Sequence, residues 1–543
     1  MGFNKERWRK NLEFVKHYAW LAFVLVLFAK YSSGISYLAS KFYAVCGQDF
    51  PLHAVNAIKI AYLKFNWADV IKLYGSLAYT PYVLELHYPP LAYLSSIFIY
   101  TLKLDPLGAT VVANMEFLFL AIVALYFAVT RFTNNGFWGA VCSMALLATY
   151  LVRSDVFDIG WRIPALSVTA VGFFVYALIV EGRDKWWRWV IIGIVLGIAG
   201  LVHVLAFIPI FSLMLVEILS QSPSKKLTFK KALGKDIKFI GSRAVMALLP
   251  AVLIMATFYF PLLFITPEHF YREMTGEGVV IWSKVAKTLI FLPRDFADIF
   301  FDNLPFVFLI VLGLLALPFC SRLYRKLFFT TLLLIFSLVF GRTYNGSLYL
   351  IPYLSVILPV STIGIWALAK KTGKIAYLIV GLAAAFIIAK PFNRTILINE
   401  FLENGVAGGF CADFGEIQDL SNALKTYSDT PQDKMAFVDC RKNIGWNGDV
   451  AIVAMALART QDAMTLWPFV RQIFNNDPRI INLQKSDLIC VIADELDPNG
   501  APVCERESIN AWADGVIKNF TLDAKYKMGE KWAVFYRGLP VQN

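Results

Sequence analysis

Apolar runs fill the first 391 residues of the chain, and each predicts a helix that crosses a membrane. A spanning helix needs about 20 predominantly apolar residues, within a range of about 17 to 25. Runs of this kind lie near 18–38, 108–130, 136–152, 164–181, 188–203, 204–221, 244–265, 304–320, 327–341, 346–369 and 375–391. The pattern predicts a polytopic α-helical membrane module over residues 1–391, with about eleven spans.

Residues 89–104 are apolar but short, and they begin with two prolines. If this segment does not cross, all the basic clusters between the runs fall on the side of the basic N-terminus. The richest cluster, 222–243, would move to the other side if the segment crossed. The positive-inside rule therefore favours a half-buried or interfacial helix for 89–104. The N-terminus is then cytoplasmic, and the chain's last part lies outside the cytoplasm.

Composition agrees with a membrane protein, since 58% of the residues are hydrophobic and only 17% are charged. Soluble domains carry about 25% charged residues. The net charge of +12 does not indicate a nucleic-acid partner, because the basic residues stand in short clusters between apolar runs. Basic residues before the first run, without a small-residue cleavage pattern, predict a signal anchor that is retained as the first span.

Residues 392–543 have an ordinary composition and predict an extracytoplasmic α/β domain. Strands are expected at 435–439, 488–492 and 532–536, and helices at 449–459 and 509–520. Four cysteines lie in this part: Cys411, Cys440, Cys490 and Cys504. An even number outside the cytoplasm fits disulfides, with three alternative pairings. Cys411–Cys440 with Cys490–Cys504 is the pairing we favour.

Candidate chemistry gathers in the first external loop, residues 39–107. Its Lys-containing, weakly amphipathic stretches around Trp67 are typical of helices that lie along a membrane surface. The loop begins with Asp49-Phe-Pro-Leu-His53 and ends with His87-Tyr88-Pro89-Pro90. A carboxylate and a His four residues on share a helix face and are the usual general bases. A simpler alternative is that Asp49 only caps a surface helix.

Taken together, these features resemble the GT-C superfamily: a long first span, the Asp49 loop, surface helices, the His87-Tyr88-Pro89-Pro90 re-entry and many further spans. Its members are integral-membrane glycosyltransferases that use polyprenyl-phosphate-linked sugars, such as protein mannosyltransferases and aminoarabinose transferases. The resemblance covers the whole membrane module. It implies that Asp49 activates the acceptor and that His53, His87 and Tyr88 lie in the substrate site.

The resemblance also implies an acidic residue in the second external loop. Asp155 and Asp158 both fit, and we favour Asp158 slightly. The alternative for Asp158 is an ordinary surface ion pair with Arg162 at i+4. Because Phe50 follows Asp49, a metal site that needs two adjacent carboxylates is in doubt. A divalent cation (Mg, Mn or Zn) is therefore only an optional cofactor.

Lipid phosphate needs cations at the outer membrane face, and arginine matches phosphate bidentately. Arg342 ends a span on the predicted outer side, and Arg162 is a further candidate. Snorkelling at the headgroups explains Arg342 equally well. His203, between two spans, either touches the sugar-phosphate or only bonds the backbone. Among intramembrane acids, Glu217 is expected to reach cytoplasmic water, and Glu116 has no obvious partner.

The sequence thus predicts an inverting glycosyltransferase, hexosyl- or pentosyl-, of the cell envelope. Asp49 acts as general base, polyprenyl phosphate leaves, and a glycan, lipid or protein hydroxyl on the extracytoplasmic side is the acceptor. The expected location is a bilayer, with a bacterial inner membrane and its periplasmic side favoured. Two alternatives remain: an oligosaccharide ligase or oligosaccharyltransferase-like enzyme, and a transporter or flippase. A transporter would predict inverted repeats and midplane charges, whereas the polar residues here gather at the outer face.

Overall fold

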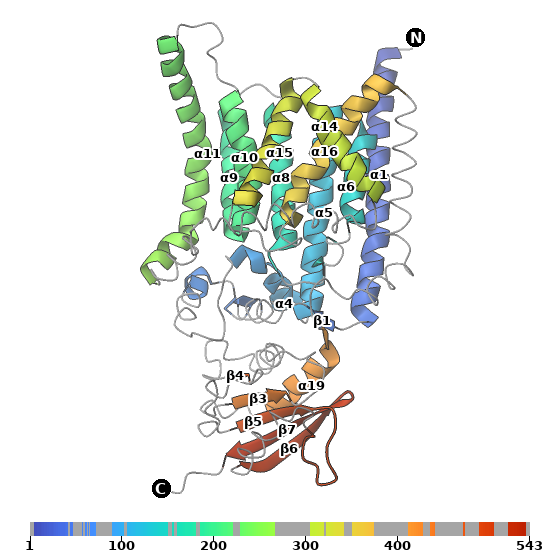
Figure 1. Ribbon diagram of the computed structural model, residues 1–543, viewed down its shortest axis with the longest axis vertical. Coiled ribbons are helices and arrows are strands. Elements are labelled where there is room, and N and C mark those ends of the chain that lie inside the picture. The colour runs from blue at the N-terminus through green and yellow to red at the C-terminus, as the bar shows by residue number, and fades with distance from the viewer. Residues whose placement is uncertain are drawn as a thin grey trace.

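The computed structural model shows an elongated molecule in which upright helices form a bundle and a β-sheet lies beyond one end (Figure 1). The N-terminus lies at the opposite end of the long axis from the sheet. The structure describes residues 5–41, 44–46, 57–71 in part, 90–102, 106–149, 152–161 in part, 162–180, 185–220, 229–265, 304–319, 322–340, 350–373, 411–426, 435–439, 471–472, 488–503 and 520–538.

Long apolar helices build the bundle. They are α1 (Lys5–Lys41), α5 (Pro106–Thr133), α6 (Gly136–Ala148), α8 (Arg162–Val180), α9 (Trp186–Val202), α10 (Val204–Ser220), α11 (Phe229–Ile265), α14 (Leu304–Ala316), α15 (Arg322–Phe340) and α16 (Ile351–Thr372). Each apolar run of the sequence coincides with one of them, except 375–391, which lies outside the described residues.

Five of the described helices are long and apolar enough to cross a membrane. They contain His17–Ser36, Gly108–Thr133, Arg162–Val180, Ile240–Pro261 and Ile351–Lys371. Shorter apolar helices cover Gly136–Ala148, Trp186–Val202, Val204–Leu219 and Ile310–Phe319. The chain is therefore a polytopic helical membrane protein, as predicted, while the number of spans stays a prediction.

Small residues allow the helix backbones to approach closely, as is typical of packing inside membranes. A methyl group on Gly193 of α9 would collide with the backbone carbonyl of Ala247 of α11. The same holds between α14 and α16, where a methyl group on Gly364 would collide with the carbonyl of Gly313. Since van der Waals contact rather than the hydrophobic effect holds helices together in lipid, these glycines fix the α9–α11 and α14–α16 pairs.

The described part of the segment 89–104, residues 90–102, does not cross the bundle, in agreement with the prediction. They form a 3₁₀ turn, η1 (Pro90–Tyr93), and a helix of seven residues, α4 (Ser96–Leu102). At 1.5 Å per residue this helix is about 10 Å long, far short of a membrane. The turn contacts α9, and the helix contacts α5. Ser96 and Ile99 are buried, so the segment is half-embedded at the sheet end of the bundle (Figure 1).

The C-terminal sheet has five strands in the order β4-β3-β5-β7-β6. The three strands expected from the sequence are present as β3 (Met435–Asp439), β5 (Leu488–Ala493) and β7 (Lys531–Gly538). The expected helix 509–520 is wrong at its end, because Phe520 begins strand β6 (Phe520–Met528), antiparallel to β7. Residues 449–459, 509–519 and the boundary at 391/392 lie outside the described part of the chain.

Several elements of the sheet end have no counterpart in the predictions. Helix α19 (Phe414–Lys425) packs against β6, and strand β4 (Arg471–Gln472) runs parallel to β3. A separate two-stranded sheet pairs β1 (Ala44–Cys46) with β2 (Cys411–Asp413). Since β1 follows α1 and β2 precedes α19, this pair joins the first external loop to the C-terminal region (Figure 1).

Cys490 lies at the centre of β5, where it is fully buried and free. The expected Cys490–Cys504 disulfide is therefore wrong. Burial raises the pKa of the Cys490 thiol well above its ordinary value, because the low-dielectric interior disfavours the thiolate. Cys142 in α6 is also buried and free, as expected of a packing residue. Cys440 and Cys504 lie outside the described residues.

Candidate functional site

A buried ion pair stands where α8 begins, at the end of the bundle that faces the sheet. The Nη1 atom of Arg162 lies 2.5 Å from Oδ1 of Asp155. The Asp155 side chain is 4% exposed and the Arg162 side chain 13% exposed. Burial of two charges is costly unless they are paired and hydrogen-bonded. The pairing offsets the cost of burying both groups and holds the guanidinium in one orientation.

An aromatic stack adjoins the ion pair. The rings of Trp161 and His203 are 3.7 Å apart between centroids and nearly parallel, at 10°. Trp161 is 2% exposed and directly precedes Arg162. His203 is the single residue between α9 and α10. The hairpin of α9 and α10 thus comes to lie against the start of α8.

The tautomer of His203 follows from its hydrogen bond to the backbone. Its Nδ1 atom accepts from the backbone N–H of Leu205 at 3.0 Å, which satisfies an amide in the first turn of α10. Because an accepting nitrogen carries no proton, the neutral imidazole holds its hydrogen on Nε2. His203 therefore does bond the backbone, as the simpler alternative states, and its other nitrogen is a donor.

Helix α5 fixes the loop that carries Asp155. The side-chain amide of Asn114 donates to the backbone carbonyl of Val156 at 3.0 Å, and Asn114 is 3% exposed. A buried hydrogen bond to the residue after Asp155 limits the movement of that carboxylate. Asp155, Trp161, Arg162 and His203 are thus one preorganised group, and Asn114 is a member that the sequence did not reveal.

The other predicted site residues lie outside the described residues: Asp49, His53, His87, Tyr88, Asp158 and Arg342. Asp155, seven residues earlier, is a described partner of Arg162, and the expected pair of Asp158 with Arg162 stays a prediction. Within the described part of the chain, no group of three His, Cys, Asp or Glu side chains could hold a metal ion. One oxygen of the Asp155 carboxylate is engaged by Arg162.

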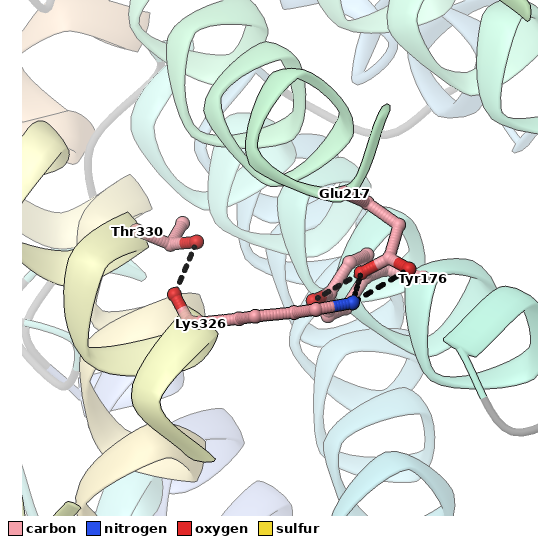
Figure 2. Close-up of polar contacts among 4 residues, drawn as sticks. All are labelled: Tyr176, Glu217, Lys326 and Thr330. Carbon is pink, nitrogen blue, oxygen red and sulfur yellow. Dashed lines mark hydrogen bonds and ion pairs between the residues drawn. The ribbon is translucent and has the colours of Figure 1, made fainter. Parts of the chain in front are cut away.

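A second polar cluster lies toward the opposite end of the bundle. Lys326 of α15 donates to both carboxylate oxygens of Glu217 of α10, at 3.1 and 3.2 Å (Figure 2). The hydroxyl of Tyr176 of α8 donates to the same carboxylate at 3.2 Å. Glu217 is 2% exposed, so the expectation that it reaches water is wrong. Each of these groups satisfies another, and the cluster joins three helices. Glu116, by contrast, is exposed on α5.

A helical bundle with a sheet attached at one end is also found in solved structures of integral-membrane proteins. ArnT from Cupriavidus metallidurans bound to undecaprenyl phosphate superposes with a TM-score of 0.60, at 10% identity, over 96% of this chain and 98% of that one. The apo state of the same protein gives a TM-score of 0.57 at 11% identity, over 96% and 97% of the two chains.

An oligosaccharyltransferase from Archaeoglobus fulgidus, in a complex with Zn and sulfate, gives a TM-score of 0.52 at 14% identity. The match covers 96% of this chain and 74% of that one. No protein-family model and no curated protein sequence matches this chain. These solved structures, at 10 to 14% identity, show that this chain has the same fold as they do.

Proposed function

We propose that this protein is a membrane glycosyltransferase that moves a sugar from a polyprenyl-phosphate donor to an acceptor hydroxyl. The observation that carries the proposal is the fold shared with ArnT over 96% of this chain. That relative was solved with undecaprenyl phosphate bound. The preorganised arginine at the sheet end of the bundle supports the same conclusion, because a lipid phosphate needs a cation at this level.

We place the site on the extracytoplasmic side. Basic residues occupy the helix ends that face away from the sheet, such as Arg131 at the end of α5, Lys370 at the end of α16 and Arg325 near the start of α15. Positive charge near span ends favours the cytoplasm. The sheet, the start of α8 and the first external loop then share the opposite side, which is the periplasmic side if the membrane is a bacterial inner membrane.

The chemical step is a single displacement at the anomeric carbon. The acceptor oxygen forms a bond to that carbon while its proton passes to the carboxylate of Asp49. The bond from the anomeric carbon to the phosphate oxygen breaks, and polyprenyl phosphate leaves with the electron pair. One displacement inverts the anomeric configuration. Asp49 is assigned this role through the resemblance. It follows β1 by three positions and lies outside the described residues.

Arg162 is the described residue best suited to the leaving phosphate. Its guanidinium is always charged and presents several donors in a plane, so charge that grows on the phosphate is stabilised without reorganisation. Asp155 is buried and bonded to this arginine, which suits a positioning residue better than a base. His203 can donate from Nε2 to a phosphate or sugar oxygen. Arg342, His53, His87 and Tyr88 complete the proposed substrate site.

No step passes through a metal ion. In the described residues the one acid of this region, Asp155, neutralises Arg162 instead of gathering with other carboxylates. The archaeal oligosaccharyltransferase was solved in a complex with Zn, and a divalent cation stays an optional cofactor of the proposed enzyme.

Turnover in a defined membrane tests the proposal. The purified protein is reconstituted in liposomes with polyprenyl-phosphate monosaccharides, each radiolabelled in its sugar, and release of polyprenyl phosphate is measured. Release with one donor supports the proposal and identifies the sugar. Failure with every monosaccharide donor, by protein whose folding is verified by its melting transition, overturns it.

Oligosaccharyl transfer is the second candidate, favoured by the similarity to the Archaeoglobus enzyme. It differs in the donor, which carries an oligosaccharide on its lipid. The same liposomes supplied with lipid-linked oligosaccharide distinguish the two candidates. The limited length of 266–303 in the sequence favours the monosaccharide donor, because a bulky glycan needs a larger external surface.

A further inference from the structure

The register of the small two-stranded sheet brings two cysteines opposite each other. β1 and β2 are antiparallel, with Ala44 opposite Asp413, Val45 opposite Ala412 and Cys46 opposite Cys411. Cα atoms of directly opposed residues in an antiparallel pair lie about 4.5 to 5.5 Å apart. A disulfide requires Cα atoms about 4.4 to 6.8 Å apart. Both kinds of antiparallel pair therefore satisfy the backbone requirement.

Other described cysteines have no such arrangement. The positions opposite Cys490 on its two neighbouring strands are Phe437 and Phe535. Cys142 is buried in the middle of a bundle helix. The expected partner of Cys411, Cys440, follows β3, which belongs to the five-stranded sheet, whereas β2 belongs to the two-stranded one. The backbone register thus favours Cys46 over Cys440.

We propose that Cys46 and Cys411 form a disulfide that ties the C-terminal region to the first external loop. It replaces the pairing Cys411–Cys440 expected from the sequence. The proposal rests on the extracytoplasmic placement of this end in the proposed function, because disulfides persist in oxidising compartments. The oxidant is a disulfide of another protein or small molecule. One thiolate attacks it, which forms a mixed disulfide and releases one donor thiolate; the second thiolate attacks the mixed disulfide and releases the other. The two protein thiols become one S–S bond, and their two protons pass to the two donor sulfurs, which leave as thiols.

The bridge has a consequence for the proposed site. Cys46 precedes Asp49 by three residues, and Cys411 precedes α19. A covalent link at this point limits the distance between the proposed general base and the start of the C-terminal region. The β1–β2 pair, which has only three residues in each strand, is thereby stabilised against separation.

Thiol counting on the full-length protein tests the bridge. Membranes are dissolved in denaturant with N-ethylmaleimide, which blocks free thiols. The disulfides are then reduced, and a second maleimide that carries a polymer of roughly 5,000 Da marks the cysteines that were oxidised. The wild type is expected to gain at least two tags. Cys46→Ser and Cys411→Ser should each lose two tags, since each single change also frees the partner.

Matched variants test the register and the sidedness separately. With both natural cysteines replaced by serine, Val45→Cys with Ala412→Cys restores an opposed pair and should regain the two tags. An impermeant maleimide applied to intact cells after reduction reports whether Cys411 faces outside. If Cys46→Ser gains as many tags as the wild type, the bridge is overturned. If the impermeant reagent still labels Cys411 in that case, the extracytoplasmic placement and the proposed function survive. If only Cys411→Ser loses tags, Cys411 is bonded to a cysteine other than Cys46, and the proposed bridge is overturned.

Discussion

Removal of the ammonium group from the Glu217–Lys326 pair should destabilise the bundle more than the loss of a surface charge. The Glu217 side chain is 2% exposed and that of Lys326 is 17% exposed. In Lys326→Met the carboxylate loses the ammonium group and still accepts from the hydroxyl of Tyr176, at 3.2 Å. Breaking a buried pair from one side costs about 3 to 5 kcal/mol, and the partial exposure of the lysine places this case near about 3.

The same reasoning predicts recovery in the double variant. Glu217→Gln with Lys326→Met removes both charges, while the glutamine oxygen still accepts from Tyr176. We expect an unfolding free energy within about 1 kcal/mol of the wild type, because the replacement of a buried ion pair by uncharged side chains often changes the stability little. Arg325→Met is the control: this neighbouring residue is exposed, and its loss should cost no more than about 0.5 kcal/mol.

Unfolding in mixed detergent micelles, followed by tryptophan fluorescence against the mole fraction of a denaturing detergent, measures these free energies. The wild type, Glu217→Gln, Lys326→Met and the double variant form the cycle and are compared under one set of conditions. The reasoning is refuted if Lys326→Met costs less than about 1 kcal/mol, which is the range of exposed ion pairs. It is also refuted if the double variant is as unstable as Lys326→Met.

Three further outcomes are expected. Arg162→Lys should lower kcat/KM for the donor by about tenfold or more while the melting temperature stays unchanged, because lysine lacks the planar fork. Asp155→Asn should lower the same constant by releasing the arginine, and an unchanged constant in both variants would contradict the phosphate role. Gly193→Ala should destabilise the α9–α11 pair by about 1 to 3 kcal/mol in the detergent titration, whereas Gly241→Ala, with open space around it, should not. Alkylation of Cys490 needs the thiolate, and burial raises the pKa of that thiol. Iodoacetamide should therefore leave Cys490 unlabelled between about pH 7 and 9 until the protein unfolds. Rapid labelling of the folded protein would contradict this.

Local patterns predicted the helices because the hydropathy of a membrane helix is carried by consecutive residues. The non-crossing segment 89–104 followed from charge placement and two prolines, and the helix of seven residues agrees. Strand β6 was missed because its alternation is interrupted: the register shifts between Leu522 and Ala524. An irregularity of this kind moves the following side chains to the other face and hides the period of two.

Long-range partners could not be read from the sequence. Glu217 and Lys326 are separated by 109 positions, and Tyr176 and Glu217 by 41. The pairing of β1 with β2 joins the first external loop to the far end of the chain. Asp155 and Arg162 could be named as candidates, but their ion pair depends on how the loop turns into α8. The roles of Asp49, Asp158 and Arg342 stay predictions.

Release of polyprenyl phosphate by Asp49→Asn tests directly whether Asp49 is the general base of the proposed transfer. Asparagine has nearly the shape of aspartate, but at neutral pH its amide does not take up the proton of the sugar acceptor's hydroxyl. With the donor that the wild type uses, we expect Asp49→Asn to lose at least about a hundredfold in turnover, which is the lower range for a general base. Asp419→Asn, an exposed acid of α19, should retain wild-type turnover. Turnover of Asp49→Asn at the wild-type rate would contradict the account.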